Sequence, residues 1–421
     1  MKNKKKRKKK KSTIKRFIDK VVLHKEDDWN SNTFSMFEVI IIILISILFG
    51  VIIGYIITCS KNPLYGSDKD LVEIVKVYEN LTDDYYDNVD RSKLSDAAIK
   101  GMVEAVEDPY TNYMDSDVAD EFNETVKGSF VGIGVTVTYD EGYYQVIDIM
   151  KNTPASKSDL KIDDIIMRVD DKDIKEDEQA FRSIRKGKVG TKVKLTVKRN
   201  DEMKDITLKR ALIEIESVHN HIFDYEDLSI GYVKIDTFAS NSYKQFKKAI
   251  DRFDKKKVDA LVIDVRDNPG GQLDQTREIL STFFPRRTVL YQIQAKNTTK
   301  KIYSSNSITK KYPVAVLING ASASAAEVLA SCFKENYKDV VIVGEKSYGK
   351  GTVQKSQTLN SGNSIKYTTE KWLTSKGKWL GDKGVIPDIT VAAPEEYYEN
   401  AIYENDTQLK EALKSLKESN K

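Results

Sequence analysis

A stretch of 21 uncharged, mostly apolar residues near the start of the chain is its most pronounced hydrophobic feature. It covers residues 39–59 and reads VIIIILISILFGVIIGYIITC. At a rise of about 1.5 Å per residue, a helix of this length spans roughly 30 Å, the hydrocarbon thickness of a bilayer. A buried helix of a soluble protein is rarely so long and so apolar, and we therefore predict a transmembrane helix over residues 39–59.

After this stretch, the spacing of the hydrophobic positions changes twice. In residues 68–126 apolar side chains recur at helical spacing, as at Leu71, Ile74, Val75 and Tyr78, which predicts helices. From residue 128 to residue 213 the period is close to two. This predicts strands at 130–137, 144–149, 165–169, 192–197 and 206–208 and a helix at 177–185, a pattern typical of a small β-sandwich or barrel.

From residue 229 onwards, strands and helices alternate. We predict strands at 231–235, 260–265, 314–318 and 340–343, and helices at 242–253, 272–283, 323–333 and 406–417. Such alternation indicates a mixed α/β sheet.

The charge of the chain is unevenly distributed. The first 25 residues hold thirteen Lys or Arg and one acid, a local charge of +12, so the remainder carries −8 of the total of +4. Few cations follow the apolar stretch, and the positive-inside rule therefore puts the basic tail in the cytoplasm and the rest outside the membrane. The tail is also expected to contact anionic lipid. A cleavable signal peptide is disfavoured because no A-x-A-like site follows, and binding of nucleic acid by the tail is disfavoured by the neighbouring membrane segment.

Cysteine and histidine are too scarce to build a metal centre of a common kind. Only Cys59 and Cys332 are present, which excludes a disulfide framework and a Cys-rich metal site. His219 and His221 are a weak pair with no third ligand beside them, and an exposed strand is the favoured interpretation.

Two segments combine the end of a strand with small residues and the start of a helix. Residues 261–271 read LVIDVRDNPGG, and paired glycines let backbone N–H groups approach a ligand closely, as an oxyanion hole requires. Residues 319–327 read NGASASAAE, which permits a tight elbow with an exposed hydroxyl at a helix N-terminus. Each segment alone is also compatible with an ordinary strand–turn–helix, the second with simple N-capping by a serine.

A third segment, residues 344–351, reads GEKSYGKG and follows a predicted strand. It nearly matches a phosphate-binding loop, but Gly351 stands where the hydroxyl that binds Mg²⁺ belongs, so nucleotide binding is disfavoured. Lys350 can instead serve as a base for a serine, provided that its amine is neutral. Lowering its pKa from about 10.4 to about 7 takes ~4.6 kcal/mol of bias against the charged form, for which desolvation beside glycines and Tyr348 is a source.

The order and spacing of these three segments resemble the C-terminal processing, or tail-specific, peptidases. The resemblance covers roughly residues 70–416 and includes VRDNPGG, SASA-x-E and GE-x-x-x-GKG-x-x-Q, as well as AIKGM at 98–102, DPY at 108–110, GSFVGIG at 128–134 and GVIPD at 384–388. It implies that Ser324 is the nucleophile, Lys350 the general base and Gln354 the residue that orients the lysine. It also implies that Gly271 and Ala325 supply the two N–H groups of the oxyanion hole.

The resemblance further implies that residues 127–213 form a PDZ-like domain, with Gly132, Ile133, Gly134 and Val135 at the loop that binds the carboxylate of a substrate's C-terminus. PDZ domains add such a tail as an extra strand, and the family prefers tails that end in apolar residues and needs no metal or cofactor. The sequence departs from the family at Ala326, at Lys186, and at Asp159 and Asp163, where PDZ glycines are expected.

These interpretations combine into an α+β multidomain protein with a single N-terminal transmembrane helix. Its expected parts are a basic cytoplasmic tail (1–38), the membrane helix (39–59), a helical N-terminal region (68–126), the PDZ-like domain (127–213), a mixed α/β Ser-Lys peptidase core (214–395) and a C-terminal helical segment (396–421). The expected function is a membrane-anchored serine endopeptidase that cleaves extracytoplasmic proteins with apolar C-terminal tails. A PDZ scaffold with an inactive peptidase fold is disfavoured because Ser324 and Lys350 are both present. A regulatory protein and self-association stay open as partners, and nucleic acid is not expected.

Overall fold

The computed structural model describes residues 36–61, 69–175, 181, 183–184, 187–307, 309–399 and 405–419. The chain divides into two units, Met1–Asp96 and Ala97–Lys421, and each is described by itself. Most of the helix predicted over residues 177–185 and most of the basic tail lie outside the described residues.

The unit Met1–Asp96 is helical where it is described. It contains α2 (Met36–Lys61), α3 (Lys69–Glu79), a π-helical turn η1 (Asn80–Asp84) and the first residues of α4 (Arg91–Glu104). Within the described ranges, α2 is the one helix that is long and apolar enough to cross a membrane, and none of the window Glu38–Tyr55 is buried by protein. The predicted helix over residues 39–59 is therefore confirmed as a helix.

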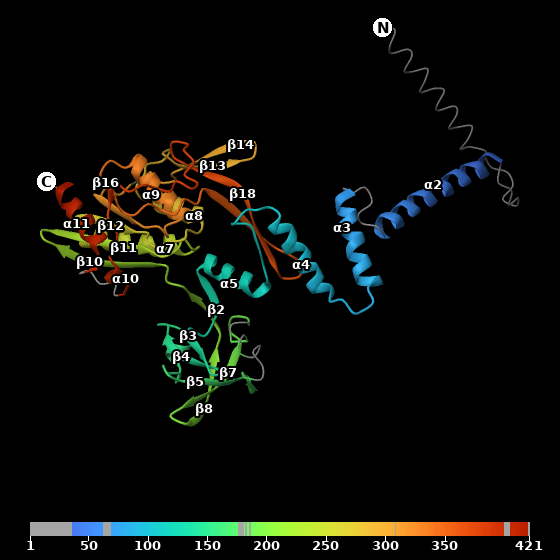
Figure 1. The fold of residues 1–421 in the computed structure, drawn as a ribbon, viewed down its shortest axis with the longest axis horizontal. Coiled ribbons are helices and arrows are strands. Elements are labelled where there is room, and N and C mark those ends of the chain that lie inside the picture. Colours follow the sequence, from blue (N-terminus) through green and yellow to red (C-terminus); the bar gives the residue numbers. More distant parts are fainter. Residues whose placement is uncertain are drawn as a thin grey trace, which may run out of the picture. The chain divides into compact units, whose positions relative to one another are not determined.

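The centre of the unit Ala97–Lys421 is a six-stranded sheet of order β10-β11-β12-β15-β16-β19 (Figure 1). Its strands are β10 (Val218–Tyr225), β11 (Leu228–Ile235), β12 (Ala260–Asp264), β15 (Val314–Ile318), β16 (Val340–Gly344) and β19 (Ile389–Thr390). β11 to β19 are parallel and β10 is an antiparallel edge strand. The mixed α/β sheet predicted for this region is confirmed.

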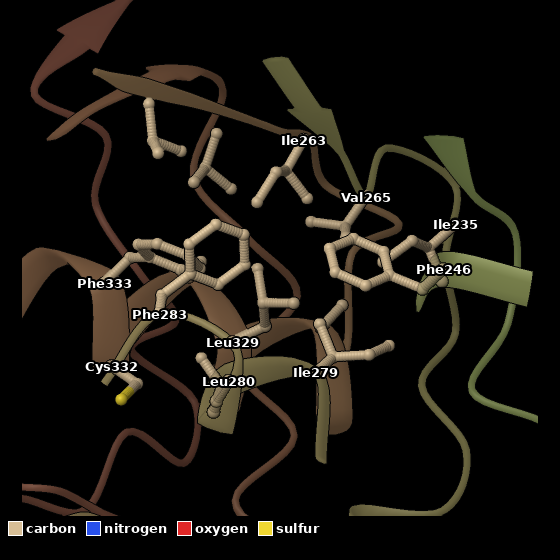
Figure 2. Close-up of a cluster of buried hydrophobic side chains, with 14 of the residues drawn as sticks. Ile235, Phe246, Ile263, Val265, Ile279, Leu280, Phe283, Leu329, Cys332 and Phe333 are labelled. Carbon is tan, nitrogen blue, oxygen red and sulfur yellow. The ribbon is translucent and has the colours of Figure 1, made fainter. Parts of the chain in front are cut away.

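Helices cover both faces of this sheet, because its central strands are apolar on both sides. On one face lie α7 (Ser242–Lys256), α8 (Leu273–Ser281) and α9 (Ala325–Asn336), which enclose the large cluster that Figure 2 shows around Phe246, Phe283 and Phe333. On the other face, Leu409 and Leu413 of α11 (Thr407–Ser419) pack against alternate residues of β11, β12 and β15. A short helix, α10 (Glu395–Glu399), precedes α11.

A buried arginine ties α11 to the end of β12. Arg266 is 2% exposed, and its guanidinium lies 2.6 Å from Asp264 and 2.8 Å from Asp406. It also donates to Gln408 at 3.1 Å. Buried charges are tolerated only when they are paired in this way, so these contacts fix the position of α11 on the sheet.

A second sheet of five strands supplies the surroundings of the third motif segment. Its strands are β1 (Asn112–Met114), β13 (Val289–Ala295), β14 (Thr298–Tyr303), β17 (Thr352–Thr358) and β18 (Ser364–Thr374), in the order β1-β18-β13-β14 with β17 paired to β18. The register of β17 against β18 shifts between Val353 and Gln354. Bulges of this kind redirect side chains and are common beside active sites.

The PDZ-like region has its own sheet and core. α5 (Ser116–Lys127) leads into β2 (Ser129–Gly132), which pairs with β9 (Ala211–Glu214). The main sheet contains β3 (Val135–Asp140), β4 (Tyr143–Ile149), β5 (Ile165–Val169), β6 (Lys172–Asp173), β7 (Lys192–Arg199) and β8 (Glu202–Lys209), with a 3-10 turn η2 (Ala155–Lys157) after β4. Val146, Ile166 and Leu195 are fully buried in this core. The prediction of a small β domain here is confirmed.

Candidate active site

The first two motif segments meet because β12 and β15 are adjacent parallel strands, so the loops at their carboxyl ends lie at the same edge of the sheet. Ala323 N–H donates to Asn268 O at 2.9 Å, which joins the two loops directly. The Asn268 side chain is fully buried, donates to Ile235 O at 2.7 Å and accepts the Gly270 N–H at 2.8 Å. Asn268 therefore fixes the Pro-Gly-Gly turn against the sheet.

Ser324 occupies a sharp elbow between β15 and α9. It is the residue before the first turn of α9 and has φ 55° and ψ −112°, a conformation that residues with a side chain rarely adopt. The elbow is held by Ser322, whose buried hydroxyl donates to Val265 O at 2.7 Å. A strained, half-buried serine at a helix N-terminus is the arrangement that nucleophile elbows use.

The paired glycines pack directly against this elbow. Gly270 and Gly271 have φ 107° and 137°, and a Cβ on Gly270 would come within 2.8 Å of Ser324 Cβ and 3.1 Å of Ala325 N. In the described part of the chain, neither Gly271 N–H nor Ala325 N–H donates to another residue. Two unpaired backbone donors thus lie beside Ser324, as an oxyanion site needs.

A single buried carboxylate connects the serine elbow with the lysine loop. Glu327 is fully buried, and its Oε2 accepts the backbone N–H of Ser324 at 2.7 Å and of Lys350 at 2.9 Å. Its Oε1 accepts from Ser347 Oγ at 2.6 Å and from Gly349 N–H at 2.7 Å. The four donors compensate the cost of burying this side chain and hold the two loops together.

The side chain of Lys350 is half-buried and lies against an aromatic ring. Its Nζ is 4.8 Å from the centroid of the Tyr110 ring, a cation–π contact, and no hydrogen bond joins it to Ser324 Oγ. Burial lowers the pKa of Lys350 below its ordinary value, and the charge of Lys366 acts in the same direction, whereas Asp108 and Glu327 oppose the shift. Burial, together with the side-chain hydrogen bond to Tyr348, raises the pKa of Tyr110 to about 12.

Gln354 is near this lysine in sequence, but its amide contacts other side chains. Gln354 Nε2 donates to Thr352 Oγ1 at 2.9 Å and to Thr368 Oγ1 at 3.2 Å. Thr368 Oγ1 donates to Asp108 Oδ2 at 2.6 Å. No hydrogen bond joins Gln354 to Lys350 among the described residues, and the expected orienting role of Gln354 stays a prediction.

The residues expected to bind a substrate tail line a hollow of about 510 Å³ together with α5. Gly132, Ile133, Gly134 and Val135 lie on one side of it, and Glu121 and Glu124 of α5 also line it. Ile133 and Gly134 donate no backbone hydrogen bond to another described residue. Gly134 has φ 85°, and a Cβ there would clash with Thr153, which explains the glycine.

The histidine pair is on an exposed strand, as the favoured interpretation predicted. His219 Nε2 lies 2.7 Å from Asp236 Oδ2, and His221 stacks on Phe223. No group of three or more His, Cys, Asp or Glu side chains suited to a metal ion occurs among the residues that the structure describes.

Sequence reasoning assigned no role to Glu327, Asn268, Asp108 or Tyr110. Glu327 stands three residues after Ser324, the spacing of a capping box, and this signal could have identified it. Asn268, Asp108 and Tyr110 stand in two of the segments that carry the family resemblance, VRDNPGG and DPY, but their contacts with segments distant in sequence could not be read from those motifs.

Three family models match the chain. They are "Peptidase family S41" over residues 229–391, "PDZ domain" over residues 131–209 and "Activating protease CtpB N-terminal domain" over residues 57–118. The match to the peptidase family thus includes all three motif segments, residues 261–271, 319–327 and 344–351.

Individual proteins match over most of their length. The carboxy-terminal processing protease CtpB of Bacillus subtilis (strain 168) is 38% identical over 353 residues, which cover 82% of this chain and 72% of that protein. CtpA of the same strain is 36% identical over 334 residues, covering 78% and 70%. Among solved structures, the photosystem II D1 C-terminal processing protease is 25% identical with a TM-score of 0.45, covering 76% of this chain and 88% of its own. The chain thus belongs to peptidase family S41 and is a C-terminal processing serine protease with a PDZ domain.

Proposed function

We propose that this protein is a membrane-anchored endopeptidase with a Ser324–Lys350 dyad, which cleaves extracytoplasmic proteins after its PDZ domain has bound their C-terminal tails. The observation that carries the proposal is the strained Ser324 beside two unpaired backbone donors, Gly271 N–H and Ala325 N–H. The lowered pKa of Lys350 supports its role as the base, since only a neutral amine can accept a proton.

The reaction proceeds by acylation and hydrolysis. Ser324 Oγ attacks the carbonyl carbon of the scissile bond while its proton passes to Lys350 Nζ, and the oxyanion is held by Gly271 N–H and Ala325 N–H. Lys350 then gives this proton to the leaving amine as the C–N bond breaks. A water molecule attacks the ester, its proton passes through Lys350 back to Ser324 Oγ, and the new carboxylate leaves.

Acylation requires the lysine side chain to leave the Tyr110 ring. In the described state Lys350 Nζ lies over that ring and not on Ser324 Oγ. Gln354, four residues on, is proposed to accept a hydrogen bond from the turned lysine and so to orient its lone pair. The described arrangement is then a resting form.

Single substitutions test the dyad. Ser324→Ala and Lys350→Ala should each abolish cleavage of an unfolded protein ending in Leu-Ala-Ala, whereas Lys346→Ala, an exposed lysine of the same loop, should cleave at the normal rate. Fragment release is followed by mass spectrometry. Cleavage by either of the first two variants at a rate comparable to the unchanged protein would refute the dyad.

The segments proposed to surround the peptidase core (214–395) are the basic cytoplasmic tail (1–38), the membrane helix (39–59), the helical region (68–126), the PDZ domain (127–213) and the C-terminal segment (396–421). The PDZ family match over residues 131–209 supports the boundaries of the fourth of these. Tail recognition is proposed at Gly132, Ile133, Gly134 and Val135, which line a hollow that contains apolar side chains such as Phe130 and Val137 beside the carboxylates of α5. Peptides that end in Leu-Ala-Ala should bind the Ser324→Ala protein at least about tenfold more tightly than peptides that end in Asp-Asp-Asp, and equal binding would contradict tail recognition.

Membrane attachment is proposed from the length and composition of α2 and from the basic residues before it. The full chain should sediment with lipid vesicles that contain anionic lipid and resist extraction with carbonate, whereas a chain that starts at Asp68 should stay in the supernatant. Release of the full chain by carbonate would exclude a spanning helix.

A further inference from the structure

A row of hydrogen bonds leads from the loop after α4 to the segment of the proposed general base. Asp108 Oδ2 accepts the hydroxyl protons of Thr111 and Thr368, each at 2.6 Å, and Asp108 Oδ1 accepts the Tyr110 N–H at 3.1 Å. Thr368 Oγ1 is in turn 3.2 Å from Gln354 Nε2. Asp108 and Thr368 are 260 positions apart in the sequence, so this row joins two distant segments at the base.

The direction of each hydrogen bond in this row is determined by Asp108. Burial raises the pKa of the Asp108 carboxyl, but the hydrogen bonds from Thr111, Thr368 and Tyr110 N–H and the charge of Lys350 outweigh it, and the pKa lies below its ordinary value. The ionised carboxylate can only accept hydrogen bonds. Thr368 has one hydroxyl proton and gives it to Asp108, so its oxygen can only accept from Gln354.

This constraint selects one of the two orientations of the Gln354 amide. Its NH2 group faces two oxygens, Thr352 Oγ1 at 2.9 Å and Thr368 Oγ1 at 3.2 Å. Because both protons are used there, Oε1 is the atom that the amide has left for another partner. The register shift between Val353 and Gln354 lets Gln354 pair with Thr368 across the two strands.

A lysine that acts as a base needs such an acceptor. The neutral amine has two protons and one lone pair, and the lone pair can point at Ser324 only if the protons are directed elsewhere. We propose that Asp108 is a positioning residue of the dyad: it fixes the Gln354 amide through Thr368, so that Oε1 accepts a hydrogen bond from Lys350 when the lysine turns toward Ser324. This inference rests on the proposed function, in which Lys350 is the base.

The same loop contacts the lysine directly. Tyr110, two residues after Asp108, supplies the ring under Lys350 Nζ. The charged groups that act on Lys350 are Asp108 from this loop, Lys366 from β18 and Glu327 from α9. Of these three groups, Asp108 is the one that raises the pKa of Lys350 and is also connected to Gln354, through the hydrogen bonds of Thr368.

The experiment compares Asp108→Asn with the double variant Asp108→Asn/Gln354→Glu in the full chain. An asparagine can donate to Thr368, which frees the threonine proton for Gln354 Oε1 and turns the amide away from its productive orientation. We expect kcat to fall by roughly 10- to 100-fold, part of the ~10²–10⁴ that a positioned base supplies, with KM changed by less than about twofold. A glutamate at position 354 has two equivalent acceptor oxygens, so it can accept from Lys350 whichever way its carboxylate is turned. The double variant should therefore regain kcat to within about threefold of Gln354→Glu alone.

The pH profile gives a second readout that a purely structural role would not move. Because the Asp108 carboxylate raises the pKa of Lys350, its removal should shift the acidic limb of kcat/KM to lower pH. Glutamate at 354 restores a carboxylate beside the lysine and should shift the limb back. Asp115→Asn, which changes an exposed carboxylate of the same region and keeps an oxygen to accept the Val118 N–H at the start of α5, is the matched control and should change kcat by less than about twofold.

The possible outcomes separate this inference from the proposed function. Unchanged kcat in Asp108→Asn, or a loss that Gln354→Glu does not restore, overturns the role of Asp108 while the dyad stands. Activity in Lys350→Ala overturns the proposed function itself. If Asp108→Asn does not fold, Thr368→Ser, which keeps the relay, should retain activity and Thr368→Val should lose it, and equal activity of these two overturns the inference.

Discussion

Ser324 and Lys350 donate their backbone N–H groups to the same atom, Glu327 Oε2, at 2.7 and 2.9 Å. The loop of the proposed nucleophile and the loop of the proposed base are therefore fixed relative to each other by their main chains. Only the lysine side chain remains to be positioned for reaction. Loss of the Glu327 carboxylate should therefore act mainly by changing the relative position of these two loops.

The first prediction concerns that carboxylate. In Glu327→Gln an NH2 group replaces one oxygen and faces two donors, which should cost about 3 kcal/mol of folding stability and lower kcat by at least about 100-fold. Chemical denaturation and the cleavage assay measure the two effects. Glu335→Gln on the same helix, where the carboxylate accepts from Ser375 and Lys376, is the control and should cleave normally. Normal cleavage by Glu327→Gln would contradict the prediction.

The second prediction is a pH dependence set by Lys366. Its positive charge lowers the pKa of Lys350, so the base is neutral at a lower pH than it would otherwise be. In Lys366→Met the pKa of Lys350 should rise, and the acidic limb of kcat/KM should move to higher pH. Lys355→Met, an exposed lysine on the neighbouring strand β17, should leave the limb in place. A limb that stays fixed or moves to lower pH in Lys366→Met would exclude this electrostatic effect.

The third prediction uses two glycines near the elbow. Gly270 has φ 107°, and a Cβ there would come within 2.8 Å of Ser324 Cβ and 3.0 Å of Ala323 O. Gly270→Ala should displace the elbow and lower kcat/KM by about 100-fold or more. Gly320→Ala adds a methyl group with nothing within 4 Å and should be active. Equal activity of the two variants would show that the close packing at Gly270 is unnecessary.

The sequence predicted the central sheet well because its strands are continuous apolar runs that end in glycine-rich turns. The strand predicted at 314–318 coincides with β15 (Val314–Ile318). The strand predicted at 130–137 is instead divided into β2 and β3, because Gly134 adopts φ 85° between them. Asp163, which stands where a PDZ glycine was expected, adopts φ 72° and keeps the turn without a glycine.

The strands of the second sheet were not predicted. β14 and β17 read TTKKIY and TVQKSQT, which have too few apolar residues to stand out, and they are strands because they pair with β13 and β18. β1 forms inside the region predicted to be helical, because Asn112 to Met114 pair with residues of β18. The local strand propensity of a segment does not depend on partners that are distant in the sequence, so it could not predict these strands.

The same limit applies to the candidate site. The motif segments point to Ser324 and Lys350 as candidates, but the alternation of strands and helices predicts only a mixed α/β sheet and not that β12 and β15 are neighbours in it. The surroundings of the lysine could not be predicted, because Asp108 and Tyr110 come from the region before the PDZ domain. The contacts of Gln354 with Thr352 and Thr368 depend on the register shift between β17 and β18, which no sequence pattern predicts.

The fourth prediction concerns the buried pair between Arg266 and Asp406. Asp406→Asn should destabilise the protein by about 3 kcal/mol, because Arg266 is 2% exposed and would lose one of its two carboxylates. Glu411→Gln, which removes a partly exposed pair with Lys414 at 3.6 Å on the same helix, should cost less than about 1 kcal/mol. Urea unfolding followed by circular dichroism compares the two, and similar midpoints would contradict the importance of the buried pair.

The position of α11 has a consequence for the order in which the enzyme matures during synthesis. A growing chain completes the serine elbow and the lysine loop more than 50 residues before the ribosome reaches Thr407. Until then, one side of the catalytic sheet is bare and the guanidinium at the end of β12 lacks its second carboxylate. The nascent chain therefore lacks the packing and the ion pair that stabilise this sheet until Asp406 and the residues of α11 have been made.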